Sequence, residues 1–279
     1  MQALEIFSQL SEEQKERLAD LWEEIGGLRN ELGCRATPYA FHRFMHEALV
    51  DKEFLGVIIY GKKGGGKSTY SIKSVATYYM RAEDMECGEA YQRALMALVF
   101  SPRDLLEKME HGAEIIIWDD AGLWGSTYMW FDPVMRRYLE ALLDWYDVAR
   151  TDVSVLIMTT PSKKKLPPRI REDADAVIAR VNKHGVKTYE GKRLKTAVIM
   201  AARNIEGIYD DRLLRQELFR DYFTVYLPDP VYEYYSIIRN AYSRYARRKL
   251  RNIVDLVEEE GDQLLVKMLR KRLGIDDEQ

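Results

Sequence analysis

The sequence predicts an α/β protein with a mainly parallel sheet and helices on both of its faces. Three apolar runs, at 54–60, 114–120 and 153–160, have the composition of strands that are covered on both sides. Helical segments alternate with these runs, which is typical of parallel sheets because each crossover needs a helix. With 279 residues, 47% of them hydrophobic, the chain can bury one large core and carry appendages.

Residues 1–52 are expected to form an N-terminal helical appendage. The segment SEEQ at 11–14 predicts a capped helix start, and helically spaced apolar residues follow until the glycine pair at 26–27. A second helix is predicted to open at Thr37-Pro38, with one apolar face made of Phe41, Phe44, Met45 and Leu49.

Residues 53–204 are expected to form the core domain, and residues 205–279 a C-terminal helical region. The segment 81–96 is ambiguous. The other predicted core elements are helices at 66–80 and 101–112, a helix from Asp132, strands at 97–100 and 176–181, and a hairpin, or a loop and a strand, around Gly191. In the C-terminal region, a helix is predicted to open at Asp229-Pro230, with one face made of Val231, Tyr234, Tyr235, Ile238, Tyr242 and Tyr245.

A glycine-rich stretch joins the first apolar run to the predicted helix at 66–80. Residues 61–68, GKKGGGKS, match G-x-x-x-x-G-K-[ST] in the strand–loop–helix context that this phosphate-binding motif needs. Ordering glycine is costly, so a bound polyphosphate explains the stretch better than an ordinary turn. The residues expected to hold the nucleotide are Gly61, Lys62, Lys63, Gly64, Gly65, Gly66, Lys67, Ser68 and Thr69.

The motif implies ATP and Mg²⁺ as cofactors. Lys67 is expected to bridge the β- and γ-phosphates, while Ser68 and Asp119 are expected to bind the metal. Asp120 is expected to orient or deprotonate the attacking water, although a solvated acid in a turn is the alternative. Thr160, at the end of its strand beside Thr159, is expected to sense the γ-phosphate or position water; turn chemistry alone is an equal alternative.

The order strand–GxxxxGKS–helix, strand–Asp-Asp, strand–Thr-Thr resembles the P-loop ATPases that have an additional strand between the two Walker strands. The segment 97–126 is similar to the helicase loaders of the DnaA/DnaC branch of the AAA+ proteins, in which Asp-Asp and a glycine end the strand, here Asp119, Asp120 and Gly122. The chain is also similar to HerA/FtsK-type DNA pumps and to the zonula-occludens-toxin-like ATPases of filamentous phages. This resemblance covers residues 54–180, and it implies a P-loop NTPase fold and an ATP-hydrolysing loading, translocation or packaging motor.

The segment that follows the sheet departs from the AAA+ pattern. AAA+ proteins carry a helical lid there, whereas residues 181–202 look more like β structure, which favours the pump or packaging branch. Arg169 and Arg171 could serve as an arginine finger across a subunit boundary of a homo-oligomer, although surface arginines are ordinary.

A GTPase-like switch is the second hypothesis. Residues 119–122 also fit the DxxG pattern, and Asn182-Lys183 follows an apolar strand as the base-reading motif of G proteins does. The aspartate that should pair with guanine is replaced by Gly185, so we rank the GTPase below the ATPase. A small-molecule kinase, for which no separate substrate motif is visible, and a non-catalytic nucleotide-binding scaffold are further alternatives.

Local basic segments are the expected DNA contacts, because the net charge of −3 gives no global attraction to nucleic acid. One such segment contains Lys163, Lys164 and Lys165; the other, at 244–251, interleaves arginines and a lysine with tyrosine. A solvated helix face is the alternative for the second segment. The aromatic stretch at 123–131 is expected to line a subunit interface, stack on bases or simply pack.

The sequence predicts a cytoplasmic location and no membrane contact. No apolar run approaches the length of about 20 residues that a membrane span requires. Cys34 and Cys87 are too few for a disulfide framework, so we expect them to be reduced.

Overall fold

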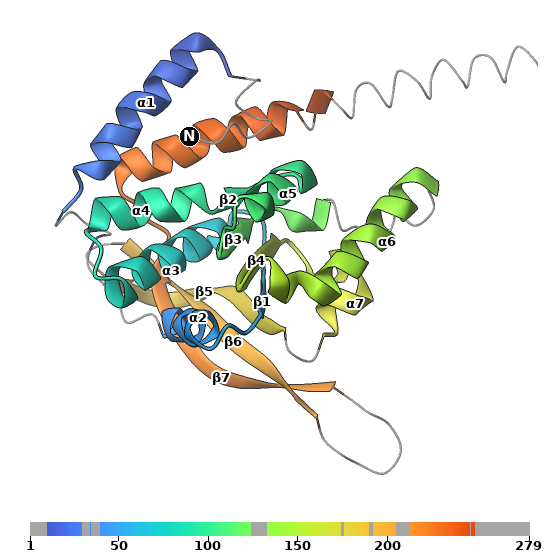
Figure 1. The fold of residues 1–279 in the computed structure, drawn as a ribbon. Helices are drawn as coiled ribbons and strands as arrows, with labels where there is room; N and C mark the ends of the chain where they lie inside the picture. The colour runs from blue at the N-terminus through green and yellow to red at the C-terminus, as the bar shows by residue number, and fades with distance from the viewer. Residues whose placement is uncertain are drawn as a thin grey trace, which may run out of the picture.

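The computed structural model describes residues 10–29, 34, 40–123, 133–173, 176–189, 192–204, 213–245 and 247–248. Helices flank a seven-stranded sheet, so the α/β class predicted from the sequence is confirmed (Figure 1). The strands are β1 (Leu55–Tyr60), β2 (Leu98–Val99), β3 (Ile115–Trp118), β4 (Val155–Thr160), β5 (Val177–Tyr189), β6 (Lys192–Asn204) and β7 (Leu213–Thr224).

The sheet has the order β2-β3-β4-β1-β5-β6-β7, in which β4 lies between β1 and β3. The first five strands in this order, β2, β3, β4, β1 and β5, run parallel, whereas β6 and β7 form an antiparallel extension. Tyr60 pairs with Thr160, and Trp118 pairs with Met158. The carboxyl ends of β1, β3 and β4 therefore meet at one edge, where open parallel sheets place their ligand sites.

Helices form where the sequence supplies caps and apolar spacing. Capping boxes at Ser11 and Ser101 begin two of the helices, and the capped start at 11–14 was predicted from the sequence. The helices are α1 (Glu12–Gly26), α2 (Phe41–Val50), α3 (Lys67–Ala82), α4 (Cys87–Met96), α5 (Pro102–Glu110), α6 (Pro133–Val148), α7 (Pro168–Arg171) and a further helix at 229–245, here called the C-terminal helix.

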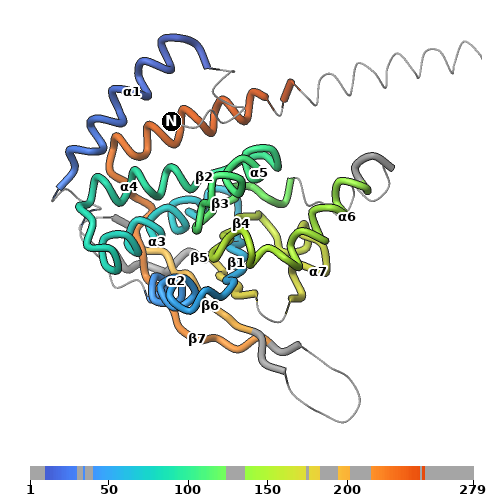
Figure 2. Tube along the Cα trace, in the orientation of Figure 1, coloured from blue at the N-terminus to red at the C-terminus, as the bar shows by residue number. Residues whose placement is uncertain are grey.

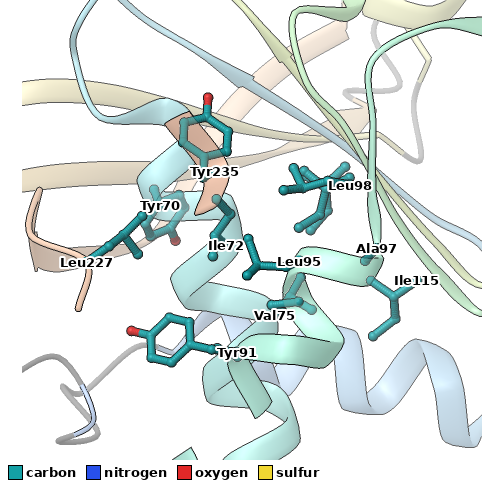
Figure 3. Packing of buried hydrophobic residues seen from close by; sticks show 14 of the residues in the cluster. Tyr70, Ile72, Val75, Tyr91, Leu95, Ala97, Leu98, Ile115, Leu227 and Tyr235 are labelled. Atoms are coloured by element: carbon teal, nitrogen blue, oxygen red, sulfur yellow. The ribbon is translucent and has the colours of Figure 1, made fainter. Parts of the chain in front are cut away.

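Both faces of the parallel part of the sheet are buried, and alternate residues of β1 face opposite ways. Val57 and Ile59 join a core cluster with α1 to α4 and the C-terminal helix, whereas Ile58 joins a second cluster with α5, α6 and α7. Figure 3 shows part of the first cluster, in which Ile72 of α3 and Leu95 of α4 lie among other buried apolar side chains.

The N-terminal helices pack on the core rather than standing apart from it. Figure 2 shows α1 running alongside the C-terminal helix. Trp22 contacts Tyr234, with ring centroids 5.5 Å apart, and Nε of Arg17 lies 2.8 Å from a carboxylate oxygen of Glu233. A Cβ atom at Gly88 of α4 would collide with the carbonyl oxygen of Ile25, so α4 and the end of α1 approach closely.

One expectation for the chain's organisation is wrong in part: residues 213–224, in the region expected to be helical, form β7, which extends the sheet of the core. The segment 81–96, which the sequence left ambiguous, contains α4. The hairpin predicted around Gly191 is confirmed by the antiparallel pairing of β5 with β6. None of the helices in the described part of the chain is both long enough and apolar enough to cross a membrane.

The expectation of two reduced cysteines is also wrong. Cys34 and Cys87 form a disulfide, with their Cα atoms 5.4 Å apart. The bond joins the connection between α1 and α2 to the first residue of α4. Disulfides occur in oxidising compartments and also inside the cells of hyperthermophilic archaea, so the bond alone assigns no compartment.

Candidate functional site

The glycine-rich loop at 61–66 connects β1 to α3 in the backbone conformation that the glycines permit. Gly64 and Gly66 have φ values of 66° and 94°, in the left-handed region that side chains disfavour. A Cβ atom at Gly66 would also lie 2.6 Å from Cγ1 of Val225, just beyond β7. Glycine is therefore required here both by the backbone and by the neighbouring end of β7.

Lys67 begins α3 and is almost completely buried, with 8% of its surface exposed. Its Nζ donates to the carbonyl oxygen of Lys62, 3.3 Å away, within the loop. Burial lowers the pKa of Lys67, and the charges of Asp120 and Asp119 oppose that shift. An anion bound beside the loop would favour the charged form of this lysine.

Asp119 is fully buried at the end of β3, and three hydroxyl groups surround its carboxylate. Ser68 and Thr159 donate to Oδ1 at 2.7 Å and 2.6 Å, and Tyr235 donates to Oδ2 at 2.7 Å. The two residues expected to bind a metal, Ser68 and Asp119, are therefore in direct contact. A buried carboxylate needs such donors, because an unpaired one is very costly.

Asp120 occupies a turn that is anchored to β4. Its φ of 54° is left-handed, a conformation that aspartate tolerates better than most residues. Its main-chain N–H donates to Oγ1 of Thr159 at 2.9 Å. Burial and the charge of Asp119 raise the pKa of its carboxyl, whereas Arg239 lowers it. A raised pKa suits a group that has to accept a proton near neutral pH.

The C-terminal helix contributes two residues that the sequence analysis did not assign to the site, Tyr235 and Arg239. Nη2 of Arg239 lies 3.3 Å from Oδ2 of Asp120, and its guanidinium lies 5.9 Å from the centre of the Tyr235 ring. Figure 3 shows the Tyr235 hydroxyl pointing away from the apolar cluster. The sequence placed Tyr235 on an apolar face of a helix, which predicts burial. This pattern does not indicate that the helix packs against the end of β3.

The pKa values of these two residues reflect the shared surroundings. Burial and the charge of Asp119 raise the pKa of Tyr235, so its phenol stays protonated and can donate. Burial lowers the pKa of Arg239, but Tyr235, Asp119 and Asp120 outweigh that effect and raise it overall.

The remaining residues expected at the site lie around this centre. Thr160 is buried, but its hydroxyl donates to the carbonyl oxygen of Ser162 at 3.0 Å, whereas Thr159 is the threonine bonded to Asp119. Thr69 is half-buried in α3, and Lys62 and Lys63 are exposed on the loop.

Lys163, Lys164 and Lys165 form the short 3₁₀ helix η5 (Lys163–Lys165), just after β4 at the same edge of the sheet. Arg169 pairs with Asp144 and Asp147 of α6, and Arg171 bonds with Glu172. Both candidate finger arginines therefore have partners within the chain.

Several further candidates lie elsewhere. Asn182 and Lys183 lie inside β5, paired with β6, rather than in a loop after a strand end. Residues 124–131 of the aromatic stretch and residues 246 and 249–251 of the basic cluster lie outside the described residues, as does Thr37-Pro38.

The donor set at Asp119 fits a hard divalent cation. Mg²⁺ prefers oxygen ligands and uses only one or two protein groups, taking its other ligands from water and phosphate. A hydroxyl and a carboxylate at contact distance satisfy that demand. The described residues contain no cluster of three or more His, Cys, Asp or Glu side chains that could hold a metal ion. A metal at Asp119 would therefore need ligands from water and phosphate.

One viral protein is similar to this chain over most of its length. The chain is 31% identical over 210 residues to Uncharacterized protein B-251 of Sulfolobus spindle-shape virus 1; the match covers 72% of this chain and 80% of the viral protein. The chain belongs to the B-251 family. No protein-family model and no solved structure matches it. The name of the viral protein states no activity, so the function of this member of the B-251 family has to be argued from its own site.

Proposed function

We propose that this chain is a Mg²⁺-dependent P-loop ATPase that acts on DNA. The observation that carries the proposal is the 2.7 Å contact between the hydroxyl of Ser68 and the carboxylate of Asp119, beside the glycine loop and Lys67. The position of β4 between β1 and β3 supports the additional-strand group of P-loop ATPases. A P-loop fold is thus part of the proposal.

The roles of the residues follow from their positions. The N–H groups of the loop and the Lys67 ammonium bind the phosphates, while Ser68 and Asp119 hold the metal. A Mg²⁺ ion held by these two residues would supply positive charge to offset the charge that develops on the phosphate oxygens. Asp120 orients the attacking water and accepts its proton, which its raised pKa favours.

Two observations support the proposal that the chain acts on DNA: the exposed basic helix η5 and the resemblance to DNA pumps and loaders. Lys164 and Lys165 are exposed near the carboxyl edge of the sheet. A homo-oligomer in the cytoplasm, without membrane contact, is the arrangement that we propose for this activity.

The test is nucleotide turnover by the purified chain with ATP and with GTP, with and without single- or double-stranded DNA. We expect ATP hydrolysis that DNA stimulates, and a loss on the order of a hundredfold or more in Lys67→Ala. Lys108→Ala is the control, because Lys108 is also buried but belongs to α5, outside the site.

Unchanged hydrolysis in Lys67→Ala would overturn the assignment of the loop. A clear preference for GTP by a monomer would favour the switch hypothesis instead. Sedimentation velocity on the same samples measures the oligomeric state.

A further inference from the structure

The C-terminal helix places two polar side chains at an edge that is otherwise built from strand ends and the glycine loop. Tyr235 bonds to Asp119 and Arg239 pairs with Asp120, at 2.7 Å and 3.3 Å. The two residues are four positions apart, so they share one face of the helix. One helix face therefore contacts both carboxylates of the site.

Arg239 has the surroundings of an arginine that can change partner. Its side chain is 47% exposed, and that of Asp120 is 26% exposed, so water reaches both. Its partner Asp120 is joined to the nucleotide loop by hydrogen bonds: the main-chain N–H of Asp120 donates to Thr159, Thr159 donates to Asp119, and Ser68 donates to the same carboxylate. A terminal phosphate bound beside Lys67 offers a guanidinium two oxygens and more negative charge than one carboxylate does.

Tyr235, in contrast, is fixed. It is 6% exposed and belongs to the apolar core cluster, and its hydroxyl reaches Oδ2 of Asp119. Because Tyr235 holds Oδ2, the other oxygen of Asp119 stays directed at Ser68. This fixes the orientation of the carboxylate that would bind the metal.

We propose that Arg239 contacts the terminal phosphate of the bound nucleotide and that Tyr235 is the positioning residue for Asp119. This inference rests on the proposed ATPase function. When Arg239 exchanges Asp120 for phosphate, the Asp120 carboxylate leaves its ion pair and its oxygens can accept a hydrogen bond from the attacking water. The C-terminal helix is then a part of the nucleotide site in the same chain.

The affinities for ATP and ADP separate this role of Arg239 from a structural one, because only ATP has the terminal phosphate. We expect Arg239→Ala to weaken Mg·ATP binding at least about tenfold, equal to about 1.4 kcal/mol, while Mg·ADP binding changes less than about twofold. Arg239→Lys should retain part of the preference for ATP as a point charge. Fluorescent ATP and ADP analogues provide the titration.

Arg17→Ala is the matched control for Arg239. It also removes an arginine ion pair from the C-terminal helix, the one with Glu233, but it lies outside the site. Both nucleotide affinities should stay unchanged in this variant.

The metal dependence tests Tyr235. We expect Tyr235→Phe to raise severalfold the Mg²⁺ concentration that gives half-maximal ATP binding, with little change in metal-free ATP affinity. Tyr234→Phe is the control, because Tyr234 is buried on the same helix but packs against Trp22.

Three results would overturn the inference. Equal losses of ATP and ADP affinity in Arg239→Ala would make Arg239 structural. An unchanged or lower Mg²⁺ midpoint in Tyr235→Phe would remove its positioning role. No nucleotide binding by the unaltered chain would overturn the proposed function itself, and this inference with it.

Discussion

Thr159 connects the two aspartates of the site through a single oxygen atom. Its Oγ1 donates to Asp119 and accepts the main-chain N–H of Asp120. The side chain is fully buried, so no water replaces either bond if the hydroxyl is lost. Thr159 therefore fixes the end of β3 relative to β4 and holds both carboxylates in place.

Thr159→Val tests this connection, because valine keeps the shape of threonine and removes only the hydroxyl. We expect a loss of about 1–3 kcal/mol in the free energy of unfolding, since the buried carboxylate of Asp119 and the half-buried N–H of Asp120 each lose a partner. ATP turnover should fall as well. Urea unfolding and a steady-state ATPase assay measure the two effects.

Thr160→Val is the comparison at the neighbouring position. Its hydroxyl bonds to one carbonyl oxygen, which has a second lone pair, so the loss of turnover should be smaller. If Thr160→Val reduced turnover as much as Thr159→Val or more, Thr160 would be the functional threonine, as the sequence predicted. Thr159 would then have no special role.

Part of the candidate site could be predicted from the sequence at this scale. The fixed spacing of the glycine-rich motif identified Lys67 and Ser68 as site residues. Asp119 was identified because it directly follows an apolar strand. Which of two adjacent threonines faces Asp119 depends on the twist and register of β4, and a Thr-Thr pair gives no signal for that choice. Arg239 was missed because its partner, Asp120, is 119 residues away in the sequence.

Among the elements, β7 was missed because its buried face is partly polar. Asp221 and Phe223 lie on the same face of β7, and both are buried. The alternating pattern that predicts a half-buried strand requires apolar residues at both positions, and the aspartate breaks it. Asp221 is tolerated because it accepts the hydroxyl of Tyr70 and the N–H of Ala40, 2.7 Å and 2.8 Å away. These partners come from α3 and from the start of α2, so the local sequence could not reveal them.

The strands at 54–60, 114–120 and 153–160 were predictable for the opposite reason. Each is apolar on both faces, which only a sheet covered on both sides can bury, and no distant polar partner is needed. The order of the strands in the sheet could not be read from their apolar pattern. The crossover connections determine that order, and the pattern within each strand is the same whatever the order.

Lys73 attaches α3 to the end of β7 and makes the stability of that contact depend on pH. Its Nζ donates to the carbonyl oxygen and the hydroxyl of Thr224, 3.1 Å and 2.9 Å away, and burial lowers the pKa of Lys73 from 10.5 to about 8. Between these values the unfolded chain binds the proton and the folded chain does not. The contribution of Lys73 to the free energy of unfolding should therefore rise with pH in this window.

Lys73→Met removes the titrating group and keeps a straight apolar side chain. We expect the stability of the unaltered chain, relative to this variant, to increase by on the order of 1–3 kcal/mol between about pH 7.5 and about pH 10. Chemical denaturation at both pH values measures it. Lys15→Met, at an exposed lysine of α1, should show no such change, and a flat difference at Lys73 would contradict the assigned pKa shift.

Across the whole molecule, the disulfide closes a loop that contains α2, β1 and α3. Cys34 and Cys87 are 53 positions apart, and nothing in their local sequence predicts that they meet. Contacts between folded elements bring them together: α1 packs along α4, and Gly88, next to Cys87, allows the close approach.

Reduction of this disulfide should destabilise the protein without dismantling the site. The unfolded chain gains the freedom of a loop of about 50 residues, which corresponds to a cost of about 2–4 kcal/mol in the free energy of unfolding. Guanidinium unfolding with and without reductant measures the cost, and the double variant Cys34→Ala, Cys87→Ala should not respond to reductant. Two thiols that react in the denatured, non-reduced protein would show the bond to be absent. Ser68, Asp119 and Tyr235 are held by hydrogen bonds to one another, and none of these bonds involves a cysteine. Nucleotide affinity should therefore survive reduction at temperatures well below unfolding, which separates support of the fold from chemistry at the site.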